Sequence, residues 1–107
     1  MNKKFGDRLK DARKSKKYTQ RILAQKIGID FSYLWKMEAG KLDYAPSEKV
    51  IRFWASELDL DSEELIFLAG RVPERDEELL KKYYQIMPSL FRQIKANPQI
   101  TKKLLAK

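Results

Sequence analysis

Residues 19–41 constrain the fold more than any other part of this chain, and they read TQRILAQKIGIDFSYLWKMEAGK. The segment predicts two short helices separated by a sharp turn at Gly28. Glycine suits that position because it alone adopts the left-handed conformation without a steric penalty. Thr19 and Asp30 are predicted N-caps, since their side-chain oxygens can accept from the unpaired amides of a first turn. Gly40 is predicted to end the second helix.

Apolar residues recur at helical spacing through this segment and predict which faces are buried. The inward residues are Leu23, Ala24, Ile27, Leu34 and Met37, with Ile29 as an apolar plug beneath the turn. The second helix leaves Phe31, Ser32, Trp35 and Lys36 on its outward faces. Two short helices with this division of faces have the layout of a helix-turn-helix that reads DNA.

Residues 5–70 resemble the Cro/phage-repressor type of helix-turn-helix, also called the xenobiotic-response-element regulator family. The matching residues are Thr19-Gln20, Leu23-Ala24, Ile27-Gly28-Ile29, Tyr33-Leu34 and Met37-Glu38-Ala39-Gly40-Lys41. Residues 45–48 and 68–73 are similar to one bacterial subgroup. The resemblance implies an all-α, compact five-helix domain that binds operator DNA, usually as a dimer.

The pattern outside the motif completes a predicted DNA-binding domain at residues 1–73. A first helix is expected from Lys3 to Lys16, with Phe5, Leu9 and Ala12 inward. Ser47 is predicted to cap a helix with an apolar stripe of Val50, Ile51, Trp54, Ala55 and Leu58. Asp61 and Glu64 predict a capping box for a fifth helix that ends at Gly70, before Pro73.

Residues 74–107 form a predicted helical extension. A helix is expected over Asp76–Met87, and Pro88 and Pro98 separate two further helical pieces. These helices either fold back on the domain or pair with a second subunit. Dimerisation is favoured because the resembled family binds twofold operators, and the basic charge of the extension could also contact flanking phosphates.

Charge is divided unevenly along the chain, whose net charge is +8. Residues 1–41 hold 12 Lys/Arg against 4 Asp/Glu, a balance of +8. Residues 42–80 hold 4 against 11 (−7), and residues 81–107 hold 7 against none (+7). The basic first part coincides with the motif, where it would attract phosphates.

The predicted base-reading residues lie near the start of the second motif helix, because that end of a recognition helix reaches base edges. Ser32 can donate or accept, Lys36 can donate to guanine O6 and N7, and Phe31 suits the thymine methyl. Phe31 and Trp35 depart from the family, which usually has polar or small residues there, so its base preference cannot be transferred. Trp35 either contacts DNA or packs against the first helix or the loop.

Phosphate contacts are predicted from the same side of the motif. The resemblance implies that Gln20 clamps the DNA backbone and braces the recognition helix. Arg21, Tyr33 and Lys41 are further backbone candidates. Lys17 is another candidate for DNA contact, although lysines such as Lys16 and Lys17 are often merely solvated. In this family the glutamate at position 38 is usually structural.

The composition argues against an enzyme. The chain has no histidine and no cysteine, the usual bases, nucleophiles and transition-metal ligands, and it has no glycine-rich phosphate loop. The acidic cluster of residues 59–64 lacks calcium-loop spacing. No cofactor, metal or small-molecule ligand is therefore expected. The longest apolar run is residues 65–69 and no secretory signal is evident, so we expect a cytoplasmic protein without a membrane partner.

These observations predict a sequence-specific, double-stranded DNA-binding transcriptional regulator. A repressor that binds a palindromic operator as a homodimer is the first hypothesis. The alternative is an antitoxin-type regulator whose C-terminal tail binds a partner protein. A third hypothesis is a protein-interaction or RNA-binding module, suggested only by the aromatic residues Phe31 and Trp35.

Overall fold

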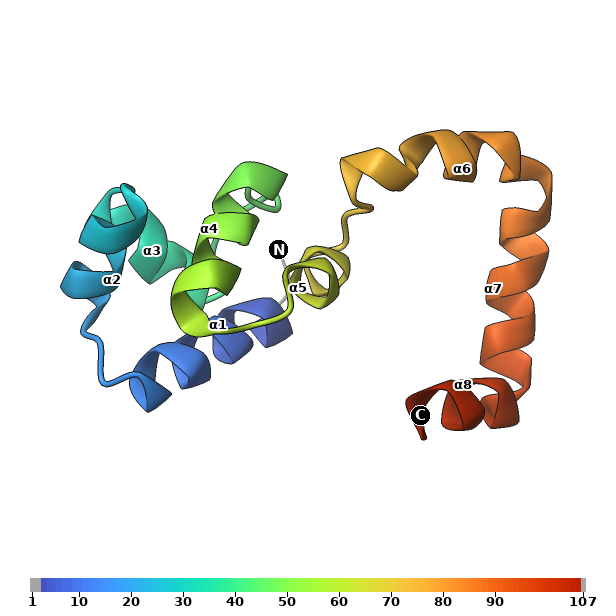
Figure 1. Ribbon diagram of the computed structural model, residues 1–107, viewed down its shortest axis with the longest axis horizontal. Coiled ribbons are helices and arrows are strands. Elements are labelled where there is room, and N and C mark those ends of the chain that lie inside the picture. The colour runs from blue at the N-terminus through green and yellow to red at the C-terminus, as the bar shows by residue number, and fades with distance from the viewer. Residues whose placement is uncertain (1–2, 107) are drawn as a thin grey trace. The chain divides into compact units, whose positions relative to one another are not determined.

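The computed structural model describes residues 3–106, and its regular elements there are all helices. This confirms the predicted all-α fold class. Contacts divide the chain into two units, residues 1–74 and 75–107. The helices of the first unit are α1 (Lys3–Ser15), α2 (Gln20–Ile27), α3 (Phe31–Glu38), α4 (Glu48–Leu58) and α5 (Ser62–Leu68) (Figure 1).

Helices α2 to α5 of the first unit begin at the predicted capping residues. Thr19 accepts from the amide of Ile22 at the start of α2, and Asp30 accepts from the amide of Ser32 at the start of α3. Ser47 and Asp61 cap α4 and α5 in the same way. Each cap satisfies a backbone donor that has no partner inside its helix. The local sequence therefore determines where these helices start.

The turn between α2 and α3 lies at Gly28, as the sequence predicted. Gly28 has φ 72° and ψ 37°, and its amide donates to the carbonyl of Ala24. The amide of Ile29 bonds the same carbonyl, which closes the end of α2. The chain then enters α3 within three residues.

A single apolar core lies between the five helices, and Trp54 of α4 is at its centre. Its ring meets Phe5 edge-on at 6.2 Å and lies parallel to Tyr33 at 6.3 Å between centroids. The other buried apolar side chains are those of Leu9, Ala12, Leu23, Ala24, Leu34, Met37, Ile51, Ala55, Leu58, Leu65, Ile66 and Ala69. The predicted inward stripes are confirmed, with Ile27, Val50 and Leu68 only partly buried.

A close approach of α1 to the end of α3 depends on Gly6. A Cβ at this position would lie 2.5 Å from the carbonyl oxygen of Met37 and 2.6 Å from that of Glu38. Ordinary side chains cannot be accommodated at such distances from backbone atoms. Gly6 thus lets α1 support the C-terminal end of α3.

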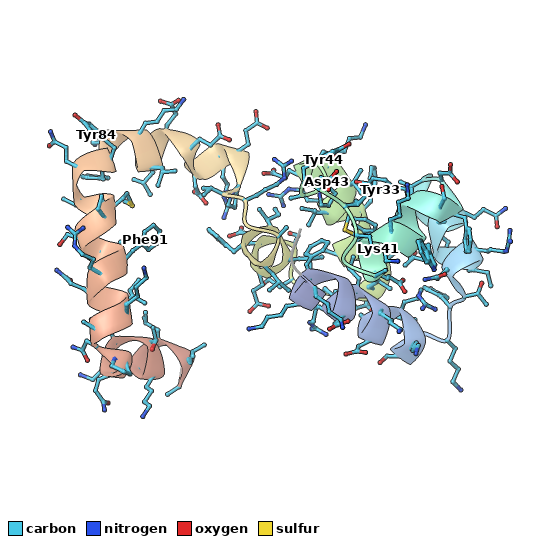
Figure 2. The ribbon with its side chains drawn as sticks, turned by 180° about the vertical axis from the view of Figure 1, so that it is seen from behind. Tyr33, Lys41, Asp43, Tyr44, Tyr84 and Phe91 are labelled. Atoms are coloured by element: carbon cyan, nitrogen blue, oxygen red, sulfur yellow. The ribbon has the colours of Figure 1, made fainter. Side chains whose placement is uncertain are left out.

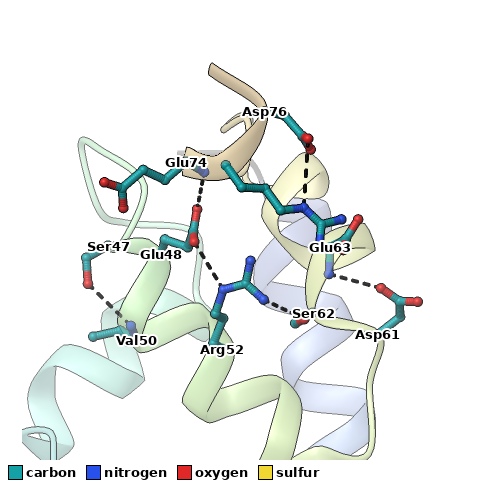
Figure 3. A network of polar contacts seen from close by, with 10 residues as sticks. Ser47, Glu48, Val50, Arg52, Asp61, Ser62, Glu63, Glu74 and Asp76 are labelled. Carbon is teal, nitrogen blue, oxygen red and sulfur yellow. Dashed lines mark hydrogen bonds and ion pairs between the residues drawn. The ribbon is translucent and has the colours of Figure 1, made fainter. Parts of the chain in front are cut away.

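A polar network joins α4 to α5 and to the end of the first unit (Figure 3). Glu48 accepts from Arg52 Nε at 3.1 Å and from the amide of Glu74 at 2.8 Å. Arg52 Nη1 also donates to Ser62 Oγ at 3.1 Å. These bonds hold the start of α5 against α4, on the opposite side of the core from α2.

The second unit contains short helices. They are η1 (Glu74–Asp76), which begins at the last residue of the first unit, α6 (Glu77–Lys82), η2 (Tyr84–Ile86), α7 (Met87–Ala96) and α8 (Pro98–Leu105). None of the described residues 75–106 is buried. The unit therefore exposes a series of apolar side chains.

The continuous helix predicted over Asp76–Met87 is wrong. It is interrupted at Tyr83, which has φ −109° and ψ 26°, and a 3₁₀ turn follows before α7 begins at Met87. Pro88 provides the reason. In a continuous helix its ring would clash with the carbonyl of Tyr84 four residues earlier, whereas a proline is well tolerated in a first turn.

Candidate nucleic-acid interface

The outward face of α3 carries four of the nine predicted DNA-contacting side chains, those of Phe31, Ser32, Trp35 and Lys36. Ser32 and Lys36 are exposed, and Phe31 is half-buried at the first position of the helix. Trp35 lies on the same face of the helix and is 44% exposed. An exposed helix face of this kind can enter a major groove.

A buried ion pair fixes the other end of α3. Arg13 of α1 donates to Glu38 through Nε (2.7 Å) and Nη2 (2.9 Å), and both residues are less than 10% exposed. Its Nη1 donates to the carbonyl of Tyr18 at 2.8 Å. Gln20 Nε2 at the start of α2 also donates to Glu38, at 3.0 Å. One carboxylate therefore links α1, α2 and α3.

Arg13 was not identified from the sequence, although a signal was present. It follows Leu9 and Ala12 on the inward stripe of α1, where a charged side chain must have a buried partner. The ion pair fits the structural role that the family resemblance implied for Glu38. Gln20 is half-buried and its amide points to Glu38, an arrangement compatible with the bracing that the family resemblance implied.

Two aromatic side chains of α3 are each covered by a cation. The Arg21 guanidinium carbon of α2 lies 4.6 Å from the Phe31 ring centroid. The Lys41 ammonium, just after α3, lies 5.0 Å from the Trp35 ring centroid. The face thus combines hydrogen-bond donors, positive charge and flat apolar surface.

Trp35 is neither a core residue nor a fully free one. It lines a shallow hollow together with Lys10, Gln20, Glu38 and Ala39. The ring is therefore partly covered beside Lys10 of α1 and still exposed on the outward face, and contact of Trp35 with DNA stays a prediction. The hollow brings Lys10, which the sequence did not single out, close to Gln20.

Tyr33 lies apart from the other candidates, because its ring stacks on Trp54 of the core. Burial raises the pKa of its phenol, the nearby Tyr44 raises it further, and Arg71 opposes the shift. Figure 2 shows Tyr33 and Tyr44 on the same side of the first unit, where the loop after α3 passes. A phosphate contact by Tyr33 would therefore come from its hydroxyl alone.

The lysines after α1 lie in a turn rather than on a helix, because α1 ends at Ser15. Lys17 has a left-handed backbone with φ 60°. Lys16 forms an ion pair and hydrogen bond with Asp59, which raises the pKa of its ammonium group. Lys16 is thus engaged within the protein, and Lys17 is exposed.

The described residues contain no group of three or more acidic, histidine or cysteine side chains that could hold a metal ion. Among the helices that the structure describes, none has the length and apolar character needed to cross a membrane.

Comparisons with known proteins agree with this geometry. A helix-turn-helix family model matches residues 9–65, more than half of the chain. The crystal structure of SinR, the master regulator for biofilm formation, in complex with DNA has 32% sequence identity to this chain. The match covers 58% of this chain and 97% of the SinR chain, with a TM-score of 0.53. The search of curated proteins gave no match.

Two further structures are similar. The restriction-modification controller protein C.AhdI from Aeromonas hydrophila is 37% identical to this chain. The match covers 58% of this chain and 91% of the C.AhdI chain, with a TM-score of 0.52. A SinR protein/SinI protein complex is 24% identical over 92% of this chain and 98% of the other, with a TM-score of 0.54, and supports the fold alone. By its family match, the chain belongs to the Cro/C1-type helix-turn-helix family of DNA-binding transcriptional regulators.

Proposed function

We propose that the protein is a repressor that binds a palindromic DNA site as a dimer, with α3 of each copy in the major groove. The observation that carries this proposal is the outward face of α3, where Ser32, Trp35 and Lys36 are exposed beside two cations. A repressor of this kind acts by occluding a promoter. Half-sites about one helical turn apart would match two copies related by twofold symmetry.

Within the proposed complex, Ser32 and Lys36 read base edges and Phe31 contacts a thymine methyl. Gln20 and Lys41 contact the DNA backbone. The Gln20 side chain is already oriented by Glu38, so its amide can donate to a phosphate with little reorganisation. The hydroxyl of Tyr33 is a further backbone contact.

The second unit is the proposed source of dimerisation. The exposed apolar side chains of α7 and α8 are Leu90, Phe91, Ile100, Leu104 and Leu105. Small monomeric proteins rarely leave so many large apolar side chains uncovered in one region. Pairing with the same helices of a second copy would cover them.

Selection of randomised duplex DNA by the full-length protein tests this proposal. An enriched palindrome with two half-sites about 10 base pairs apart is expected. Enrichment of a single, non-repeated half-site would contradict dimeric binding. Salt-sensitive binding without any enriched sequence would contradict base reading by α3.

A second candidate function follows from the same exposed helices. An antitoxin-type regulator would bind DNA through the first unit and a partner protein through the second. The purified protein would then remain monomeric at concentrations where a homodimer should form. Sedimentation velocity of the protein alone distinguishes the two functions, because only the first predicts a dimer without a partner.

A further inference from the structure

The Arg21 side chain is held at the edge of α3 while its hydrogen-bond donors stay unengaged. Its guanidinium lies over the Phe31 ring at 4.6 Å. Among the described residues, no hydrogen bond or ion pair engages this group. Arg13, Arg52 and Arg71, in contrast, all donate to oxygen atoms of the protein.

The position over the ring leaves the guanidinium able to bind something else. A guanidinium over an aromatic face keeps its N–H groups available around its rim, because the attraction involves only its flat face. Arg21 is the second residue of α2, where positive charge is unfavourable to the helix dipole. Helix stability therefore does not explain this arginine. The cation–π contact does restrict a long side chain in advance, which reduces the entropy lost on binding.

Phe31 places this arginine beside the expected base-reading positions. It is the first residue of α3, directly after the Asp30 cap, and its ring is only half-buried. The ring and the guanidinium are 4.6 Å apart, not far from the rise of about 3.4 Å between successive base pairs. Side chains at this separation can contact neighbouring base pairs in one groove.

We infer that Arg21 and Phe31 act together to read a thymine next to a guanine. Phe31 contacts the C5-methyl group of the thymine, and Arg21 donates to O6 and N7 of the guanine. This inference rests on the proposed insertion of α3 into the major groove. It replaces the backbone contact that the sequence predicted for Arg21, and makes Arg21 a specificity-determining residue.

Selection of randomised duplexes by the wild-type protein and by Arg21→Lys and Arg21→Ala tests the inference. The wild-type motif is expected to contain the thymine–guanine pair of neighbours in each half-site. Both variants should lose the guanine preference by on the order of tenfold or more, and keep the rest of the motif. Arg21→Lys is the matched control for charge, since it keeps the cation and removes the planar donor geometry.

Modified duplexes first test each contact with the unaltered protein, and this part of the result does not depend on the folding of a variant. Replacing the thymine by uracil removes only the methyl group, and replacing the guanine by 7-deazaguanine removes only N7. Each should weaken wild-type binding several-fold. The Arg21→Ala variant should be insensitive to 7-deazaguanine but still sensitive to uracil.

The outcomes separate the inference from the function on which it rests. If wild type selects a motif but Arg21→Ala weakens binding to all duplexes equally, Arg21 is a phosphate contact and the inference is overturned. Equal sensitivity of wild type and Arg21→Ala to 7-deazaguanine also overturns it. If wild type selects no motif, the proposed function itself fails.

Discussion

Arg13 of α1 and Glu38 of α3 form a two-pronged hydrogen-bonded ion pair, with N–O distances of 2.7 and 2.9 Å, in a site that solvent barely reaches. The pair also engages Gln20, the first residue of α2. It therefore fixes the angle between the helix predicted to read DNA and the helix that supports it. A defect in this pair should disturb stability first and DNA binding as a consequence.

Glu38→Ala is expected to destabilise the first unit strongly. Removing the carboxylate leaves the buried Arg13 guanidinium without its charged partner, and loss of one member of a buried pair costs about 3–5 kcal/mol. Urea denaturation followed by circular dichroism measures the change. Glu78→Ala is the control, because its pair with Lys81 is exposed and should change stability by less than about 0.5 kcal/mol. Similar effects of the two variants would contradict a structural role for Glu38.

Gly6→Ala should also destabilise the fold, although alanine favours helices. The added methyl group would meet two backbone carbonyl oxygens of α3 at 2.5 and 2.6 Å, and overpacking of a core costs about 1–3 kcal/mol. The higher helix propensity of alanine returns at most about 1 kcal/mol. A net loss in the denaturation midpoint is therefore expected, with the exposed Asp11→Ala on the same helix as control. A gain in stability would show that α1 can move away from α3.

The features that the sequence predicted correctly are local ones. Each cap requires only a short polar side chain beside the amides of its own helix, and the Gly28 turn requires only its own backbone conformation. The apolar stripes are equally local, because their period directly reflects which face is buried. These signals were sufficient to predict the five helices of the first unit and the outward face of α3.

All but one of the features that the sequence did not predict depend on residues far apart in the chain. Arg13 is 25 positions from Glu38, and the need for glycine at position 6 arises from carbonyl groups of α3. The stacking of Tyr33 on Trp54 likewise depends on how α3 meets α4. The break before Pro88 was a missed local signal, since the proline affects the turn that precedes it.

Lys36→Ala tests base reading at the centre of the α3 face. Its exposed ammonium group is predicted to donate to a guanine, so the variant should lose about 1–3 kcal/mol on the selected site and relax the preference at one base pair. Titration of the cognate duplex and its single-base variants gives both quantities. Lys14→Ala, an exposed lysine of α1, should leave the preference unchanged. An intact preference in Lys36→Ala would remove this residue from the base-reading set.

Lys41→Ala tests a phosphate contact beside Trp35. The ammonium group lies over the indole ring, which holds a mobile cation near the end of α3. Loss of one phosphate contact should weaken all duplexes alike and flatten the slope of log K against log salt by about one unit. Lys49→Ala on α4 has the same charge change and should leave the slope unaltered. A sequence-dependent loss in Lys41→Ala would instead indicate a base contact.

Self-association of the protein tests the proposed role of α7 and α8. One side of α7 carries Met87, Leu90, Phe91 and Ile94. Phe91→Lys should weaken a dimer built on that side. Gln93→Lys, whose side chain faces away from it, should not.

Residues 81–107 carry 7 Lys/Arg and no Asp/Glu, so two copies of this segment repel each other. Because screening shortens the range of charge interactions from about 10 Å at 0.1 M salt to about 3 Å at 1 M, the dimer should tighten as salt rises. Sedimentation equilibrium measures both effects, and an association that weakens with salt would contradict the pairing of α7 and α8 with the same helices of a second copy.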